Sequence, residues 1–133
     1  MSHDTPHSSQ GSNDMLDALK ACAREKAPDR TLVDVRIGLY YTAVLLDDGA
    51  AGVAYTFRNE ITSGSGSFHG ARPLAGKKAI DVIPYITSDD LCERTVGIAT
   101  ANALINRERQ GLIEGDILDV LSPDKDDTIG MVG

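Results

Sequence analysis

The spacing of apolar residues predicts one long helix that the rest of the fold encloses. Between residues 91 and 105, apolar and small residues recur at steps of three and four, which stacks them on one helix face. A second apolar stripe runs beside the first, and no charged residue occurs from Thr95 to Ile105. A helix with a solvent-exposed face would carry charges there, so we expect this helix to be largely buried.

Polar residues mark both ends of this helix. Thr87 and Asp90 have the spacing of a capping box, and carboxylates here favour the positive end of the helix dipole. Arg107 and Arg109 fall in the predicted last turn, and Gly111 can adopt the left-handed conformation that stops a helix.

The preceding chain predicts a helix followed by three strands. Residues 13–27 have helical spacing, with Ser12 as the expected N-cap, and Pro28 follows them. Three β-prone runs follow, at residues 32–39, 41–46 and 51–57. In the first run, Val33, Val35 and Ile37 are expected on one face, opposite Asp34 and Arg36.

The short connections between these runs favour an antiparallel meander. A tight bend is needed near residues 38–40, and Asp47-Asp48-Gly49 is a hairpin signal. A further short helix is predicted at 79–86, limited by Pro84. The predicted fold is α+β, with a three-stranded antiparallel meander packed on one face against about three helices.

Composition divides the chain into three parts. Residues 1–13 are rich in Ser, His and Gly and are interpreted as a disordered leader, and residues 14–122 as the α+β domain. Residues 123–133 combine an acidic turn with a β-prone run that begins at Thr128. Either the chain is cut at a domain boundary, or this run pairs within the existing sheet.

Charge and apolar content restrict the classes of partner. The chain has 133 residues and a net charge of −7, which disfavours a nucleic acid or an anionic membrane as the main partner. Neither an apolar run of roughly 20 residues nor a signal-peptide core is present, so we expect a cytoplasmic location. Cys22 and Cys92 lack a second Cys or His at ligand spacing and are expected to be buried free thiols.

Asn102 is the unusual member of the apolar helix face, because a buried amide must find hydrogen-bond partners. It either bonds neighbouring backbone or contacts a ligand, and Arg94 lies two turns earlier near the same side. The small residues Gly64, Ser65 and Gly66 belong to a segment that could cradle an anion or act as a flexible connector. His69 could be a base or metal ligand, or a solvated loop histidine.

Several segments together resemble one family. The chain is similar, from about residue 16 to residue 133, to the amino-terminal domain of a heavy-metal-chelation family, also known as a domain of unknown function. The most specific segment has the form Arg-x-x-Gly-x-Ala-x-x-Asn-Ala, at residues 94–103. The other marks are residues 34–38 with 41–44, 52–56, 74–76 and 129–133.

The resemblance implies an enolase amino-terminal-like domain that precedes a Rossmann-like domain in the same chain, with an active-site cleft between the two. On this resemblance, we expect the Rossmann-like domain to be missing after Gly133. The expected ligand is a divalent or heavy metal ion or a small anionic molecule. The ligand-binding residues are expected to be Arg94, Asn102, Gly64, Ser65 and Gly66, with His69 as a metal candidate.

Two other classes of function remain open. The chain could be a structural module or a homodimerisation module without a ligand site of its own, whose exposed face drives self-association. Catalysis by this chain alone ranks lowest, because the sequence has no recognisable nucleophile–base pair, and Asp34 with Arg36 is interpreted as a solvated ion pair. No catalytic residue is therefore assigned.

Overall fold

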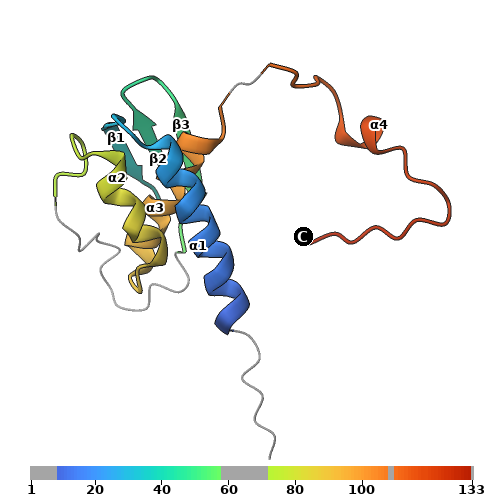
Figure 1. Ribbon diagram of the computed structural model, residues 1–133, viewed down its shortest axis with the longest axis horizontal. Helices are drawn as coiled ribbons and strands as arrows, with labels where there is room; N and C mark the ends of the chain where they lie inside the picture. The colour runs from blue at the N-terminus through green and yellow to red at the C-terminus, as the bar shows by residue number, and fades with distance from the viewer. Residues whose placement is uncertain (1–8, 58–71, 108–109, 133) are drawn as a thin grey trace, which may run out of the picture.

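The computed structural model describes residues 9–57, 72–107 and 110–132, and these form a three-stranded antiparallel sheet with helices (Figure 1). The sheet order is β1-β2-β3, which confirms the predicted α+β meander. In chain order the elements are α1 (Ser9–Lys26), β1 (Leu32–Ile37), β2 (Tyr41–Leu46), β3 (Ala51–Tyr55), α2 (Ala79–Val82), the 3-10 helix η2 (Ile83–Thr87), α3 (Leu91–Ile105) and α4 (Ile117–Leu121).

Tight turns connect the three strands, as predicted. Between β1 and β2, the backbone N–H of Gly38 donates to the carbonyl of Tyr41 at 2.9 Å. Between β2 and β3, Gly49 has φ of 87°, a conformation that glycine adopts without a steric penalty. The Asp48 carboxylate accepts a hydrogen bond of 3.1 Å from the Ala50 N–H and so fixes this turn.

The predicted alternation of side chains along β1 is wrong at one position, because the strand contains a β-bulge. The register with β2 shifts between Leu32, which pairs with Leu46, and Asp34, which pairs with Leu45. The extra residue, Val33, is 52% exposed, whereas Leu32 is fully buried. Strict alternation puts Val33 on the same face as Val35 and Ile37, and the bulge breaks that alternation.

Helix α3 is the middle layer of the fold, which confirms the predicted burial. It contacts β2 and β3 on one side and α1, α2 and η2 on the other (Figure 1). Gly52 allows the sheet to approach, because a Cβ there would lie 2.1 Å from the Ala99 carbonyl oxygen. Gly97 allows the opposite approach, because a Cβ there would lie 2.5 Å from the Ile86 nitrogen.

The predicted caps of two helices are wrong. Asp90, not Thr87, is the N-cap of α3, and its carboxylate accepts hydrogen bonds from the N–H groups of Cys92 and Glu93 at 2.8 and 3.1 Å. Thr87 belongs to η2, because the chain turns through a 3-10 helix before α3 begins. Ser12 lies within α1, which starts at Ser9 and thus earlier than predicted.

Pro84 limits the short helix, as predicted. Helix α2 ends at Val82 and continues as η2, with Pro84 in its first turn. Proline has no N–H to donate to the carbonyl four residues earlier, so the α-helical pattern cannot continue through it.

The C-terminal segment packs against nothing in the described structure. Every described residue from 110 to 132 is exposed, and Figure 1 shows the segment leaving the fold after α3. Helix α4 is five residues long, and residues 128–132 form no strand, so they do not extend the sheet. In the described ranges, no helix is both long and apolar enough to span a membrane.

Candidate functional site

Arg94 holds the start of α3 to the end of η2. Its Nε and Nη2 atoms both donate to the carbonyl of Ser88, at 2.9 and 2.7 Å. The side chain is half-buried. Two of the guanidinium N–H groups are thus committed to the backbone of this connection, which fixes the orientation of the side chain.

Asn102 bonds to the outer edge of the sheet. Its Nδ2 donates to the carbonyl of Val53 at 2.7 Å. At the two ends of the β2–β3 ladder, the Thr56 N–H donates to the Tyr40 carbonyl and the Leu46 N–H donates to the Ala50 carbonyl. Strand alternation then directs the Val53 carbonyl away from β2, so Asn102 occupies an edge position that another strand would use. The backbone-bonding interpretation of Asn102 is confirmed.

The structure does not bring the predicted ligand residues together. Arg94 and Asn102 are eight residues apart on α3, about 12 Å along its axis, and they bond to different parts of the backbone. Gly64, Ser65, Gly66 and His69 lie outside the described residues. A ligand role for any of these residues stays a prediction.

A pocket of about 360 Å³ opens at the other edge of the sheet, beside β1. The chain that follows residues 72–75 bonds to the start of β1: Gly76 donates to the Leu32 carbonyl at 2.8 Å, and Leu32 donates to the Lys77 carbonyl at 2.9 Å. The pocket is lined by Asp34, Val35, Ile37, Arg72, Pro73, Leu74 and Ala75.

The lining of this pocket is apolar with two charged groups, Asp34 and Arg72. The Asp34 carboxylate also accepts from Arg36 Nε at 2.7 Å, which confirms the predicted ion pair. Sequence reasoning interpreted that pair as merely solvated and did not identify the pocket. The approach of residues 72–75 to β1 is a long-range contact, so no local pattern indicates it.

The chemistry of the pocket fits a bare metal ion poorly and an anionic group better. A heavy metal ion prefers several thiolate, imidazole or carboxylate donors, and this lining contains one carboxylate, already bonded to a guanidinium. Arg72 carries a guanidinium group, whose planar arrangement of N–H donors matches carboxylates and phosphates. Across the described ranges, no three His, Cys, Asp or Glu side chains are grouped so that they could hold a metal ion.

The two cysteines are free thiols in different surroundings. Cys92 is buried, as expected, while Cys22 is only half-buried. Burial, with a smaller contribution from the Asp90 carboxylate, raises the pKa of the Cys92 thiol. Because the thiolate is the form that binds metal, this environment disfavours Cys92 as a ligand.

Comparison with known proteins identifies relatives of this chain. Residues 20–105 match the model of the DUF4213 family, which is described as "Putative heavy-metal chelation". A DUF364-family protein of unknown function from Pyrococcus horikoshii is 31% identical, with a TM-score of 0.62 over 80% of this chain and 43% of its own. A second DUF364-family structure, from Desulfitobacterium hafniense DCB-2, is 17% identical, with a TM-score of 0.51 over 71% and 35% of the two chains.

The chain spans less than half the length of these two solved structures. The second of them supports the fold alone, because its sequence identity is low. A search of curated proteins gave no match.

Proposed function

The chain belongs to the DUF4213 family, whose description is "Putative heavy-metal chelation". We propose that it forms half of a site for a metal-bearing or small anionic ligand. The other half of the site is a Rossmann-like domain that normally follows in the same chain. In this proposal residues 14–122 are an enolase amino-terminal-like domain, and residues 123–133 lead into the second domain. The length of the relatives supports it, since this chain covers 43% of the Pyrococcus horikoshii protein.

The observation that carries the proposal is the pocket between β1 and residues 72–75. Its apolar walls exclude water from part of a ligand, and Arg72 and Asp34 give it one positive and one negative group. A metal would then enter as a complex with an anionic molecule, and Arg72 would bond to the oxygen atoms of that molecule.

Arg94 and Asn102 have a different part in this proposal from the one predicted. Their hydrogen bonds to the carbonyls of Ser88 and Val53 support a positioning role, in which they fix α3 against η2 and the sheet. Direct contact of Arg94 or Asn102 with a ligand stays a prediction.

A second candidate function is a structural module without a ligand site. The exposed apolar side chains on the solvent face of the sheet favour it, because such a face suits another protein surface. In both versions the partner is a protein or a small molecule rather than a nucleic acid or a membrane, and the location is cytoplasmic.

Calorimetric titration distinguishes the two candidates. The probes are Zn²⁺ alone, citrate alone and the Zn²⁺–citrate complex, added to this chain and to the Pyrococcus horikoshii relative. The ligand-site proposal predicts that citrate or its zinc complex binds the relative, and binds this chain more weakly because this chain spans only 43% of the relative's length. No binding of any probe to the longer protein would favour the structural module.

A further inference from the structure

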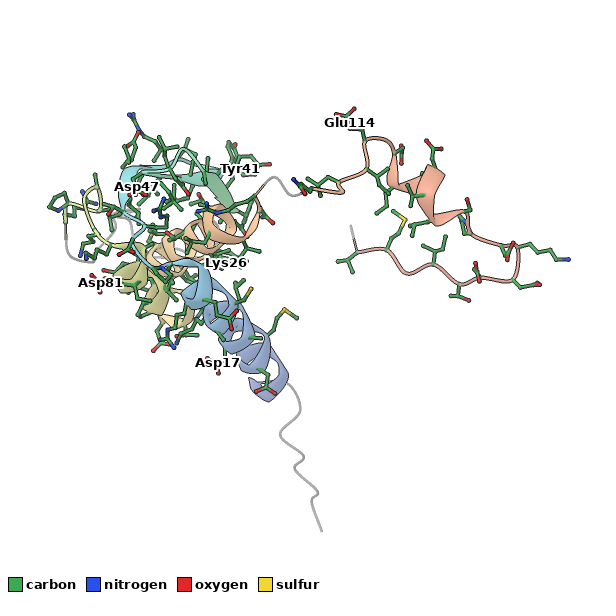
Figure 2. All side chains as sticks on the ribbon, turned by 45° about the horizontal axis from the view of Figure 1, so that its top comes forward. Asp17, Lys26, Tyr41, Asp47, Asp81 and Glu114 are labelled. Carbon is green, nitrogen blue, oxygen red and sulfur yellow. The ribbon has the colours of Figure 1, made fainter. Side chains whose placement is uncertain are left out.

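The side of the sheet that faces away from α3 is apolar and exposed. Side chains of cross-strand pairs on β2 and β3 form this surface, and Figure 2 shows Tyr41 there. An antiparallel sheet with one solvated side normally alternates apolar residues inward with polar residues outward. The outer sheet face, as we name it, consists of Tyr41 with Tyr55, Ala43 with Val53, and Leu45 with Ala51.

The exposure of these side chains is substantial. Tyr41 is 66% exposed, Val53 52%, Tyr55 51% and Leu45 38%. Phe57 packs edge-on against Tyr55, with ring centroids 5.9 Å apart, and extends the aromatic cluster beyond the strand. The whole chain has only four tyrosines and two phenylalanines, so half of its aromatic residues gather here. Tyrosine is enriched at protein interfaces.

We infer that a second copy of this chain covers the outer sheet face, in a two-fold dimer whose sheets pack face to face. This inference shares one residue with the proposed ligand site, because Asp34 also lines the pocket at the β1 edge, whereas the residues of the outer sheet face lie outside that lining. A homodimer requires a surface that is complementary to itself under two-fold rotation.

The charges beside the apolar area supply that complementarity. Asp34 pairs with Leu45 and Arg36 with Ala43 across β1 and β2, so both charged residues lie on the same face as the apolar group. The Arg36 side chain is 82% exposed and that of Asp34 42%. In a two-fold arrangement, Arg36 of one copy can meet Asp34 of the other, and the reverse contact then forms as well.

The sheet edges favour a face-to-face contact over edge pairing. At β3, Asn102 bonds to the outward carbonyl of Val53, and α3 lies against Gly52. At β1, residues 76 and 77 occupy the backbone groups of Leu32. Addition of a strand from another chain is therefore obstructed at β3 and at the start of β1.

The size of the face predicts a weak, reversible dimer. A fully buried aromatic side chain covers roughly 150–250 Å², and about half of each tyrosine is available. With Leu45 and Val53 included, each copy would bury on the order of 500 Å², against roughly 800 Å² per partner in a standard stable interface. Association should therefore depend strongly on protein concentration.

Sedimentation equilibrium of the full chain, from low micromolar to near-millimolar concentration, tests the inference. The wild type should shift from monomer to dimer, and Tyr41→Glu or Val53→Lys should weaken dimerisation about tenfold or more. Met15→Lys is the control, because Met15 is 74% exposed on α1, away from the face, and its substitution should change nothing. Thermal unfolding by circular dichroism verifies that each variant is folded.

A charge exchange tests the two-fold geometry. Arg36→Asp alone should weaken dimerisation, and the combination of Asp34→Arg with Arg36→Asp should restore it. The exposed C-terminal segment is the competing cause of association, so Leu118→Asp with Leu121→Asp is made in parallel. A strictly monomeric wild type overturns the inference. So does association that the C-terminal substitutions abolish while Tyr41→Glu leaves it unchanged.

Discussion

Asn102 and Val53, 49 positions apart in the chain, are joined by a hydrogen bond of 2.7 Å from the side-chain amide to the backbone carbonyl. This bond connects the last turn of the central helix to the edge strand of the sheet. It gives the one amide on the apolar helix face a structural partner, and it satisfies a carbonyl that the strand ladder leaves unpaired.

Substitution of Asn102 should therefore reduce stability. We expect Asn102→Ala to lower the free energy of unfolding by about 1 kcal/mol, because the Val53 carbonyl loses a partner but can still reach water. Urea denaturation measures this, with Asn106→Ala, an exposed amide at the C-cap of the same helix, as the control. An unchanged midpoint for Asn102→Ala would show that the bond contributes little.

Gly97 is a test of the close packing of α3. In an exposed helix, Gly→Ala stabilises by about 1 kcal/mol, because alanine has the higher helix propensity. Here the added Cβ would lie 2.5 Å from the Ile86 nitrogen, so we expect Gly97→Ala to destabilise by about 2 kcal/mol or more. Gly130→Ala, outside the helices, is the control for an added methyl group without a steric clash, because nothing lies within 4 Å of its Cβ position. Thermal melts of both variants show whether each substitution raises or lowers the stability.

Asp48 should make stability depend on pH. The Ala50 N–H, with further help from the Arg107 guanidinium, holds the pKa of Asp48 below 3.8 against the opposing effect of burial. A carboxyl group whose pKa is lower in the folded state stabilises above its unfolded pKa. Its contribution should thus be complete above about pH 5 and decline as the pH falls through the folded pKa.

The measurement is urea unfolding of the wild type and Asp48→Asn at neutral pH and near pH 3. The stability difference between the two proteins should shrink at the lower pH. Asp81→Asn, at an exposed position on α2, controls for general acid effects. A difference that stays constant over this range would contradict the assignment.

The two thiols should differ in reactivity. Cys22 is half-buried, whereas burial of Cys92 raises its pKa and reduces the thiolate fraction. Iodoacetamide should modify Cys22 first, and Cys92 should react at a comparable rate only in denaturant. Mass spectrometry of digested protein follows both sites, and Cys22→Ser isolates the slower one. Equal rates in the native protein would contradict the described burial.

The sequence indicated the architecture well where the signal was local. The uncharged run in α3 correctly predicted a buried helix, and Asp47-Asp48-Gly49 correctly predicted the hairpin. The caps were less predictable, because Thr87 and Asp90 both have suitable side chains, and the 3-10 turn of η2 decides between them. The bulge at Val33 also gives no local signal, since Val33 continues the alternation of its neighbours.

The candidate site depends on long-range contacts, so most of it could not be predicted from local sequence patterns. Arg94 and Asn102 were singled out because charged and amide groups are unusual on a buried helix, and that signal found residues with real partners. It could not say that the partners are backbone carbonyls from η2 and β3. The pocket needs residues 72–75 to meet β1, nearly 40 positions earlier in the chain.

The most direct test of the proposed function is titration of this chain with citrate and with Zn²⁺–citrate, comparing the wild type with Arg72→Ala. The proposal predicts measurable binding of at least one of these anionic probes to the wild type and at least about a tenfold loss in the variant, because the guanidinium bonds to the anion. Lys77→Ala, a substitution outside the pocket lining, should bind like the wild type. Equal binding by the wild type and Arg72→Ala would contradict a ligand site at the β1 edge.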